Sequence, residues 1–159
     1  MQIAEMLARE AIRYTVALYH KNGDSGNYDN HVNVFHPDCE VVVQGGKVLR
    51  GVPEVITAFK AGAAMRKAFE GKNFQRHQLT TSMIEVTSDT TAEGRHFLFV
   101  VTELGFDHSG TYNDLFQKHG DRWLIKRREA TMEWARADSR FVQWLGQPTK
   151  GLVDVKDGQ

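Results

Sequence analysis

Aspartate, serine and histidine are the residue types in this sequence whose spacing could form a reactive site. Residues 23–26 (Gly-Asp-Ser-Gly) match the letters around the nucleophilic serine of trypsin-like proteases, but 159 residues with one cysteine are too few for that disulfide-bonded fold. His31 and His36 are five residues apart, which does not place them on one helical face, and no third ligand has metal-site spacing. The sequence has no glycine-rich phosphate loop or dinucleotide fingerprint. We therefore expect no metal and no cofactor.

The first half of the chain predicts helices around a hairpin. Val16 and Tyr19 recur at helical spacing, and Gly23 follows where a helix commonly stops. Pro53 suits the first turn of a later helix. The expected elements are a helix over residues 3–21, a short helix over 27–35, a turn at 36–38, hairpin strands over 39–44 and 47–50, and a helix over 51–71.

The second half predicts long strands separated by turn-rich segments. Four strands in series indicate an antiparallel meander, and helices followed by a meander are typical of an α+β domain with the helices over one face or end of the sheet. The strands are expected over residues 74–86, 91–104, 111–118 and 123–134. We expect one domain over residues 1–134, followed by a tail or lid over residues 135–159 with one helical turn near Phe141.

The composition indicates which classes of binding partner and which cellular location to expect. The 20 basic and 20 acidic residues are balanced and interspersed, which disfavours nucleic acid and membrane partners. The longest apolar run, residues 97–101, is too short to cross a bilayer. Residues 1–5 do not have the pattern of a charged leader with an apolar core. Cys39 is the only cysteine, so no intrachain disulfide forms. We expect a cytoplasmic protein.

Several short motifs, in a specific order, carry a family resemblance. They are residues 19–24 at the end of the first helix, the Phe-His-Pro-Asp turn at 35–38, the histidine-containing strand start at 76–80, Gly-x-Tyr-x-Asp at 110–114 and Gly-x-x-Trp-x-x-x-x-Arg at 120–128. Over about residues 5–134 the sequence resembles the SnoaL-like branch of the nuclear transport factor 2-like superfamily, which includes scytalone dehydratase and hexachlorocyclohexane dehydrochlorinase. The resemblance implies a curved antiparallel sheet that forms a cone-shaped barrel, with N-terminal helices packed over it and a small-molecule pocket inside.

The resemblance also implies roles for individual residues. Asp24 falls on the family's catalytic aspartate and His77 on its catalytic histidine, where the aspartate would accept the Nδ1 proton and Nε2 would remove a substrate proton. Arg128 matches an arginine that could stabilise a departing anion or an enolate oxygen. Tyr19 could donate a hydrogen bond to a carbonyl. The remaining substrate-binding positions that we expect are Thr81, Tyr112 and Asp114.

Structural roles for the same residues are the alternative. Asp24 lies in a loop-like composition that suits a solvated turn or a helix cap, and His77 alone would be an ordinary strand histidine. Residues 127 and 128 alternate sides of their strand, so one arginine should face solvent. Tyr112 could pack in the core, and Asp114 could be a structural hydrogen-bond partner.

The function expected from the resemblance is a cofactor-independent lyase of the dehydratase type. His77, oriented by Asp24, would remove a proton next to a leaving group on an apolar or polyketide-like small molecule. An isomerase or a polyketide cyclase would use the same pocket, and a ligand carrier or an oxygenase-subunit-like structural module would use the fold without chemistry. We also expect a homo-oligomer, a dimer or trimer, built on aromatic strand residues: Phe97, Phe99, Phe116, Trp123 and Trp134.

Overall fold

The computed structural model describes residues 2–67, 74–139 and 141. Helices come first and long strands follow, which confirms the α+β class. The elements of the described residues are α1 (Ile3–Ser25), the short 3-10 helix η1 (Tyr28–Asn33), β1 (Phe35–Val42), β2 (Val48–Arg50), α2 (Gly51–Lys67), β3 (Gln75–Val86), β4 (Thr91–Thr102), β5 (Gly105–His119) and β6 (Arg122–Ala135).

All six of these strands form one sheet, in the order β2-β1-β6-β5-β4-β3. Strands β3 to β6 are the predicted antiparallel meander, but β1 pairs with β6 in parallel, so the sheet is mixed rather than wholly antiparallel. It is also not closed into a barrel, because β2 and β3 remain at opposite edges. Sequence patterns identify strands but not the direction in which strands far apart in the chain pair, which explains this correction.

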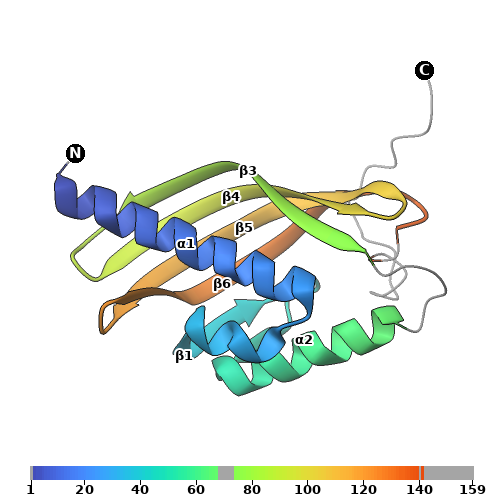
Figure 1. Cartoon of the computed structure of the whole chain (residues 1–159), viewed down its shortest axis with the longest axis horizontal. Coiled ribbons are helices and arrows are strands. Elements are labelled where there is room, and N and C mark those ends of the chain that lie inside the picture. The colour runs from blue at the N-terminus through green and yellow to red at the C-terminus, as the bar shows by residue number, and fades with distance from the viewer. Residues whose placement is uncertain (1, 68–73, 140, 142–159) are drawn as a thin grey trace.

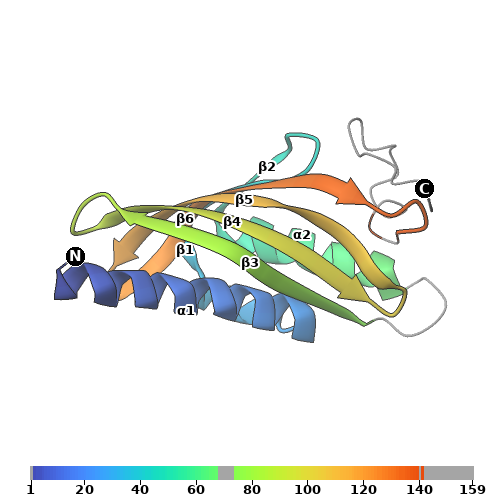
Figure 2. The ribbon, with the colours of Figure 1, turned by 90° about the horizontal axis from the view of Figure 1, so that it is seen from above.

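Both helices lie on the same side of the curved sheet, and α1 runs along its strands (Figures 1 and 2). Ile12 and Val16 on α1 are buried in one cluster with Phe35 of β1 and Phe116 and Ile125 of the meander. Each such side chain contributes about 1.5–3 kcal/mol when it is removed from water. No helix in the described part of the chain is long and apolar enough to span a membrane.

Several boundaries differ from expectation. The segment 36–38 lies inside β1 instead of forming a turn, and β5 begins at Gly105 rather than near Thr111. Gly110 looks like a turn residue in the sequence, but it is required inside the sheet, because a Cβ there would lie 2.2 Å from the carbonyl oxygen of Thr131. The expected end of the third helix near residue 71, and most of the expected tail over 135–159, fall outside the described residues.

Shifts in strand register mark β-bulges that change which residues face the helices. One extra residue is inserted in β3 near Thr81, one in β5 at Asp107 and two in β6, at Lys126 and at Glu133. Side chains normally alternate along a strand, so each bulge reverses the inward and outward positions that follow it. These four bulges therefore change which side chains of β3, β5 and β6 face the interior.

Candidate active site

The last turn of α1 carries the first group of site residues. The helix continues past Gly23 to Ser25 and ends at Gly26, whose φ of 72° is the left-handed conformation typical of a glycine that terminates a helix. Asp24 therefore lies on a helix rather than in a loop. His20 precedes it by four residues, which places both side chains on the same helical face.

Asp24 holds His77, which lies on β3 and is 53 residues away in sequence. The Nδ1 atom of His77 lies 2.6 Å from Oδ1 of Asp24, and the backbone N–H of His77 donates to Oδ2 at 3.0 Å. Both side chains are mostly buried. A carboxylate only accepts hydrogen bonds, so Nδ1 carries a proton, and in the neutral imidazole Nε2 is then the atom with the lone pair.

Two neighbouring cavities meet at this pair. The main cavity, of about 420 Å³, is lined by His77 and by apolar side chains that include Leu49, Phe59 and Leu98. The side cavity, of about 340 Å³, is lined by Asp24. The main cavity lies within the range of small-molecule sites. Residues that line both are Gly23, Tyr28, Gln75, His108 and Phe141.

Arg128 lines the main cavity, but its charge is already neutralised by a partner. Asp114 on β5 accepts from Nε at 2.8 Å and from Nη2 at 2.6 Å, and the arginine is fully buried. Burial opposes the charge, yet the Asp114 carboxylate raises the pKa of Arg128. Asp114 is thus a structural partner of Arg128, while Arg127 is half-exposed and donates to Glu40.

Two tyrosines enclose the guanidinium group. The Arg128 Cζ atom lies 4.2 Å from the ring centre of Tyr19 and 4.1 Å from that of Tyr112, and both rings line the main cavity. Burial raises the pKa of both phenols, so each hydroxyl keeps its proton and can donate. Nη1 of Arg128 has no hydrogen-bond partner among the described residues. These three groups are the candidate donors to a substrate oxygen.

Thr81 lies outside the candidate site, although we expected it to bind substrate. It is exposed and does not line either of these two cavities. Simple alternation from His77 and Leu79 would point Thr81 inward, but the bulge in β3 pairs Leu79 with Leu98 and then Ser82 with His96. Ser82 takes the inward position, and its hydroxyl lies 2.7 Å from Nδ1 of the fully buried His96.

Sequence reasoning missed three histidines that line the main cavity, His20, His31 and His108. The His20 ring centre lies 5.4 Å from that of His77, and burial lowers the pKa of His20 to about 2. Its position four residues before Asp24 was a signal that could have identified it. No signal of that kind marks His31. Among the described residues, no three His, Cys, Asp or Glu side chains are arranged as metal ligands.

Solved structures with this arrangement of elements have low sequence identity to the chain. A protein of Novosphingobium aromaticivorans assigned as a scytalone dehydratase is 18% identical, with 100% of both chains covered and a TM-score of 0.74. LinA, a hexachlorocyclohexane dehydrochlorinase, is 13% identical over 83% of this chain and 90% of its own, with a TM-score of 0.71. A protein of unknown function with a cystatin-like fold from Nostoc punctiforme is 19% identical over 85% of this chain and 96% of its own, with a TM-score of 0.69.

At these identities the solved structures establish the fold alone. No curated protein gives a significant sequence match. The family model of the SnoaL-like domain matches residues 4–129, which is most of the chain. This range contains nearly all of α1, the whole of β3 to β5, and Arg128 of β6. The chain therefore belongs to the SnoaL-like domain family.

Proposed function

We propose that the protein is a cofactor-independent lyase that eliminates water from a small apolar or aromatic, polyketide-like molecule. The observation that carries the proposal is the 2.6 Å contact between Nδ1 of His77 and the Asp24 carboxylate, beside a cavity with many apolar side chains. The carboxylate fixes the tautomer in which Nε2 is a base and stabilises the imidazolium that forms when Nε2 takes a proton.

The reaction would begin at a carbon next to a carbonyl group. Nε2 of His77 takes a proton from that carbon, and the C–H electrons move to the carbonyl oxygen as an enolate. When the enolate collapses, its electrons form a carbon–carbon double bond and the C–O bond of a β-hydroxyl group breaks. The His77 imidazolium returns its proton to the leaving oxygen, so water departs and the base is regenerated.

The enolate oxygen needs donors in a site from which water is excluded. The hydroxyl groups of Tyr19 and Tyr112 and the Nη1 group of Arg128 are suited to this role. Because Asp114 neutralises the guanidinium, the substrate is expected to be uncharged rather than an anion. Donors arranged in advance around a developing oxyanion are commonly worth a factor of about 10² to 10³ in rate.

Two of the similar structures support elimination as the reaction class, since one is assigned as a dehydratase and the other is a dehydrochlorinase. The same base would catalyse isomerisation or cyclisation if the enolate were protonated, or attacked an electrophile, at another carbon. A carrier would bind the same ligands without removing a proton.

Proton removal can be tested before the substrate is known. β-Tetralone, a bicyclic aromatic ketone with acidic C–H groups, should exchange hydrogen for deuterium in heavy water faster with the protein than in buffer. His77→Ala should lower the enzyme-dependent rate by about 10² to 10⁴ fold, the usual contribution of a general base. NMR or mass spectrometry measures the deuterium content.

The matched control is His119→Ala, because His119 is an exposed histidine at the end of β5. It should leave the exchange rate unchanged. An equal rate in His77→Ala and the wild type would reject His77 as the base. Binding of the ketone without any enzyme-dependent exchange would favour the carrier.

A further inference from the structure

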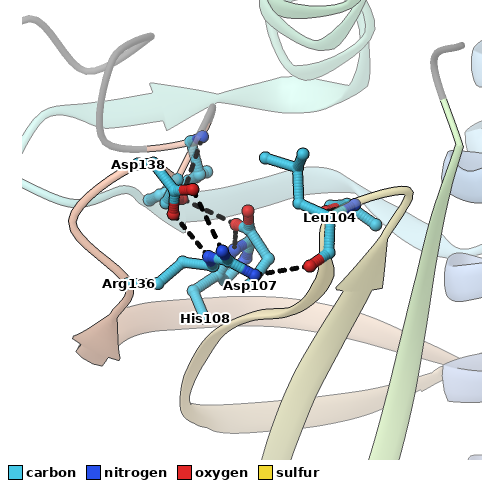
Figure 3. A network of polar contacts seen from close by, with 8 residues as sticks. Leu104, Asp107, His108, Arg136 and Asp138 are labelled. Atoms are coloured by element: carbon cyan, nitrogen blue, oxygen red, sulfur yellow. Dashed lines mark hydrogen bonds and ion pairs between the residues drawn. The ribbon is translucent and has the colours of Figure 1, made fainter. Parts of the chain in front are cut away.

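A second histidine–aspartate pair faces the same cavities from β5. Nδ1 of His108 lies 2.6 Å from Oδ2 of Asp107, and both residues are buried (Figure 3). His108 lines both cavities, whereas His77 lines only the main one of the two. The proposed elimination uses His77 and Asp24 and gives this second pair no role.

The pair exists because of the bulge in β5. Adjacent residues of a regular strand point to opposite faces, so neighbours in sequence cannot both be buried on one side. Here Val100 pairs with His108 and Val101 pairs with Phe106, which leaves Asp107 as the extra residue. The bulge turns the Asp107 carboxylate inward beside the imidazole, and bulges of this kind are common next to active sites.

Two residues after β6, Ser139 and Arg136, also bond Asp107, and Ser139 bonds the same carboxylate oxygen as His108. The hydroxyl of Ser139 donates to Oδ2 of Asp107 at 2.7 Å, and the backbone N–H of Arg136 donates to the Asp107 carbonyl at 2.9 Å. Arg136 itself is fixed by the Asp138 carboxylate and the Leu104 carbonyl, as Figure 3 shows. Burial alone would raise the pKa of Asp107, but hydrogen bonds from His108 and Ser139 lower it, so the group is ionised.

The His108 ring is therefore fixed in one tautomer. An ionised Asp107 accepts the Nδ1 proton, and burial lowers the pKa of His108, so the imidazole is neutral. The Phe141 ring lies against it with the centres 4.6 Å apart. Nε2 carries a lone pair and accepts no hydrogen bond from any residue that the structure describes. A neutral acceptor of this kind matches an O–H donor, whereas a ligand carboxylate would be repelled by Asp107.

We propose that His108 is the hydroxyl-binding residue of the site, whose Nε2 accepts a hydrogen bond from a phenol, enol or alcohol group of an aromatic or polyketide-like ligand where the two cavities meet. This assignment rests on the proposed function for the choice of cavity and ligand class. It adds that the substrate carries a second hydroxyl group, distinct from the β-hydroxyl group that leaves as water.

Binding of two matched probes tests the assignment without turnover. β-Naphthol and its methyl ether have similar shapes, but only the naphthol can donate. Calorimetry should give a preference of roughly tenfold for the naphthol, the usual effect of one neutral hydrogen bond. His108→Phe keeps an aromatic ring against Phe141 and should abolish the preference while leaving affinity for the methyl ether nearly unchanged. His77→Ala should retain the preference.

A measurement on the wild-type protein tests the assignment even if the His108→Phe variant does not fold. Long-range ¹⁵N NMR should show the His108 Nε2 resonance moving on addition of β-naphthol and not on addition of the ether. Equal affinity for the two probes, a preference lost in His77→Ala but kept in His108→Phe, or a stationary Nε2 resonance would overturn the assignment. None of these outcomes bears on deuterium exchange by His77, so the two proposals fail separately.

Discussion

His20 is a buried polar residue that none of the described hydrogen bonds satisfies. Its Nε2 atom has no partner among the described residues, and its ring contacts those of His77 and Tyr112. Burial lowers its pKa to about 2, so the ring stays neutral beside the proposed base. A permanent charge there would oppose formation of the His77 imidazolium, and the neutral ring avoids this.

The low pKa of His20 predicts a stability that depends on pH. The unfolded chain protonates this residue below its ordinary value of 6.5, but the folded protein does not until about 2. Stability should therefore be fully present above 6.5 and fall by about 1.4 kcal/mol per pH unit as the pH drops through this window. His20→Phe should remove that share of the slope and raise stability at neutral pH. Urea unfolding between pH 5 and 8 measures the free energy of unfolding and its dependence on pH. The same pH dependence in His20→Phe and the wild type would contradict the burial of His20.

Three other buried histidines should also make the fold less stable as the pH falls. Burial lowers the pKa of His31, His96 and His108 below the ordinary value. Acid should thus weaken the fold at several points around the cavities. A His20→Phe protein should still lose stability in acid, with a shallower slope than the wild type.

At the scale of the element, the end of α1 allows a clean test of backbone conformation. A Cβ added at Gly23 or at Gly26 would meet nothing within 4 Å, so packing does not distinguish the two positions. Gly23 is helical, and Gly23→Ala should stabilise by about 0.5–1 kcal/mol. Gly26 has a φ of 72°, and Gly26→Ala should destabilise by about 1 kcal/mol. Urea unfolding of both variants should give opposite signs, and equal signs would show that α1 does not end at Gly26.

The site could be predicted from the sequence only where the strands are regular. The contact between Asp24 and His77 matches the family motifs, and the order of the four meander strands follows from four separated β segments, whereas the pairing of β1 with β6 does not. The bulges have no comparable signal, because one extra residue leaves composition unchanged while it reverses inward and outward positions. Thr81, which we expected to bind substrate, therefore lies exposed and outside both cavities. Asp107 and His108 fall between the expected strands 91–104 and 111–118, where aspartate, glycine and serine are typical of a turn.

At the scale of the whole molecule, the sheet face away from the helices carries exposed apolar side chains. Met83, Phe97 and Leu115 are exposed at 70%, 40% and 43%. Phe116 and Trp123, which we expected to contribute to assembly, are buried in the core instead. No described element covers this face (Figure 2).

We therefore expect this face to form a dimer or trimer, because association would remove the apolar side chains from water. Phe97→Ser should shift the protein toward monomer. Tyr14→Ser is the matched control, because Tyr14 is 69% exposed on α1, away from this face, and should leave the state unchanged. Light scattering at micromolar concentration measures the mass, and a monomeric wild type would reject the prediction.

The parallel pairing of β1 with β6 also sets an order of events during synthesis. Phe35 pairs with Ile125, 90 residues later, so among the described strands β1 has only the short β2 as a partner until β6 has left the ribosome. Contacts this distant in sequence slow folding because a long loop must close first. The apolar residues of α1 and β1 then remain exposed to chaperones while the meander is made, and the cavity with its two histidine–aspartate pairs is completed in the final step.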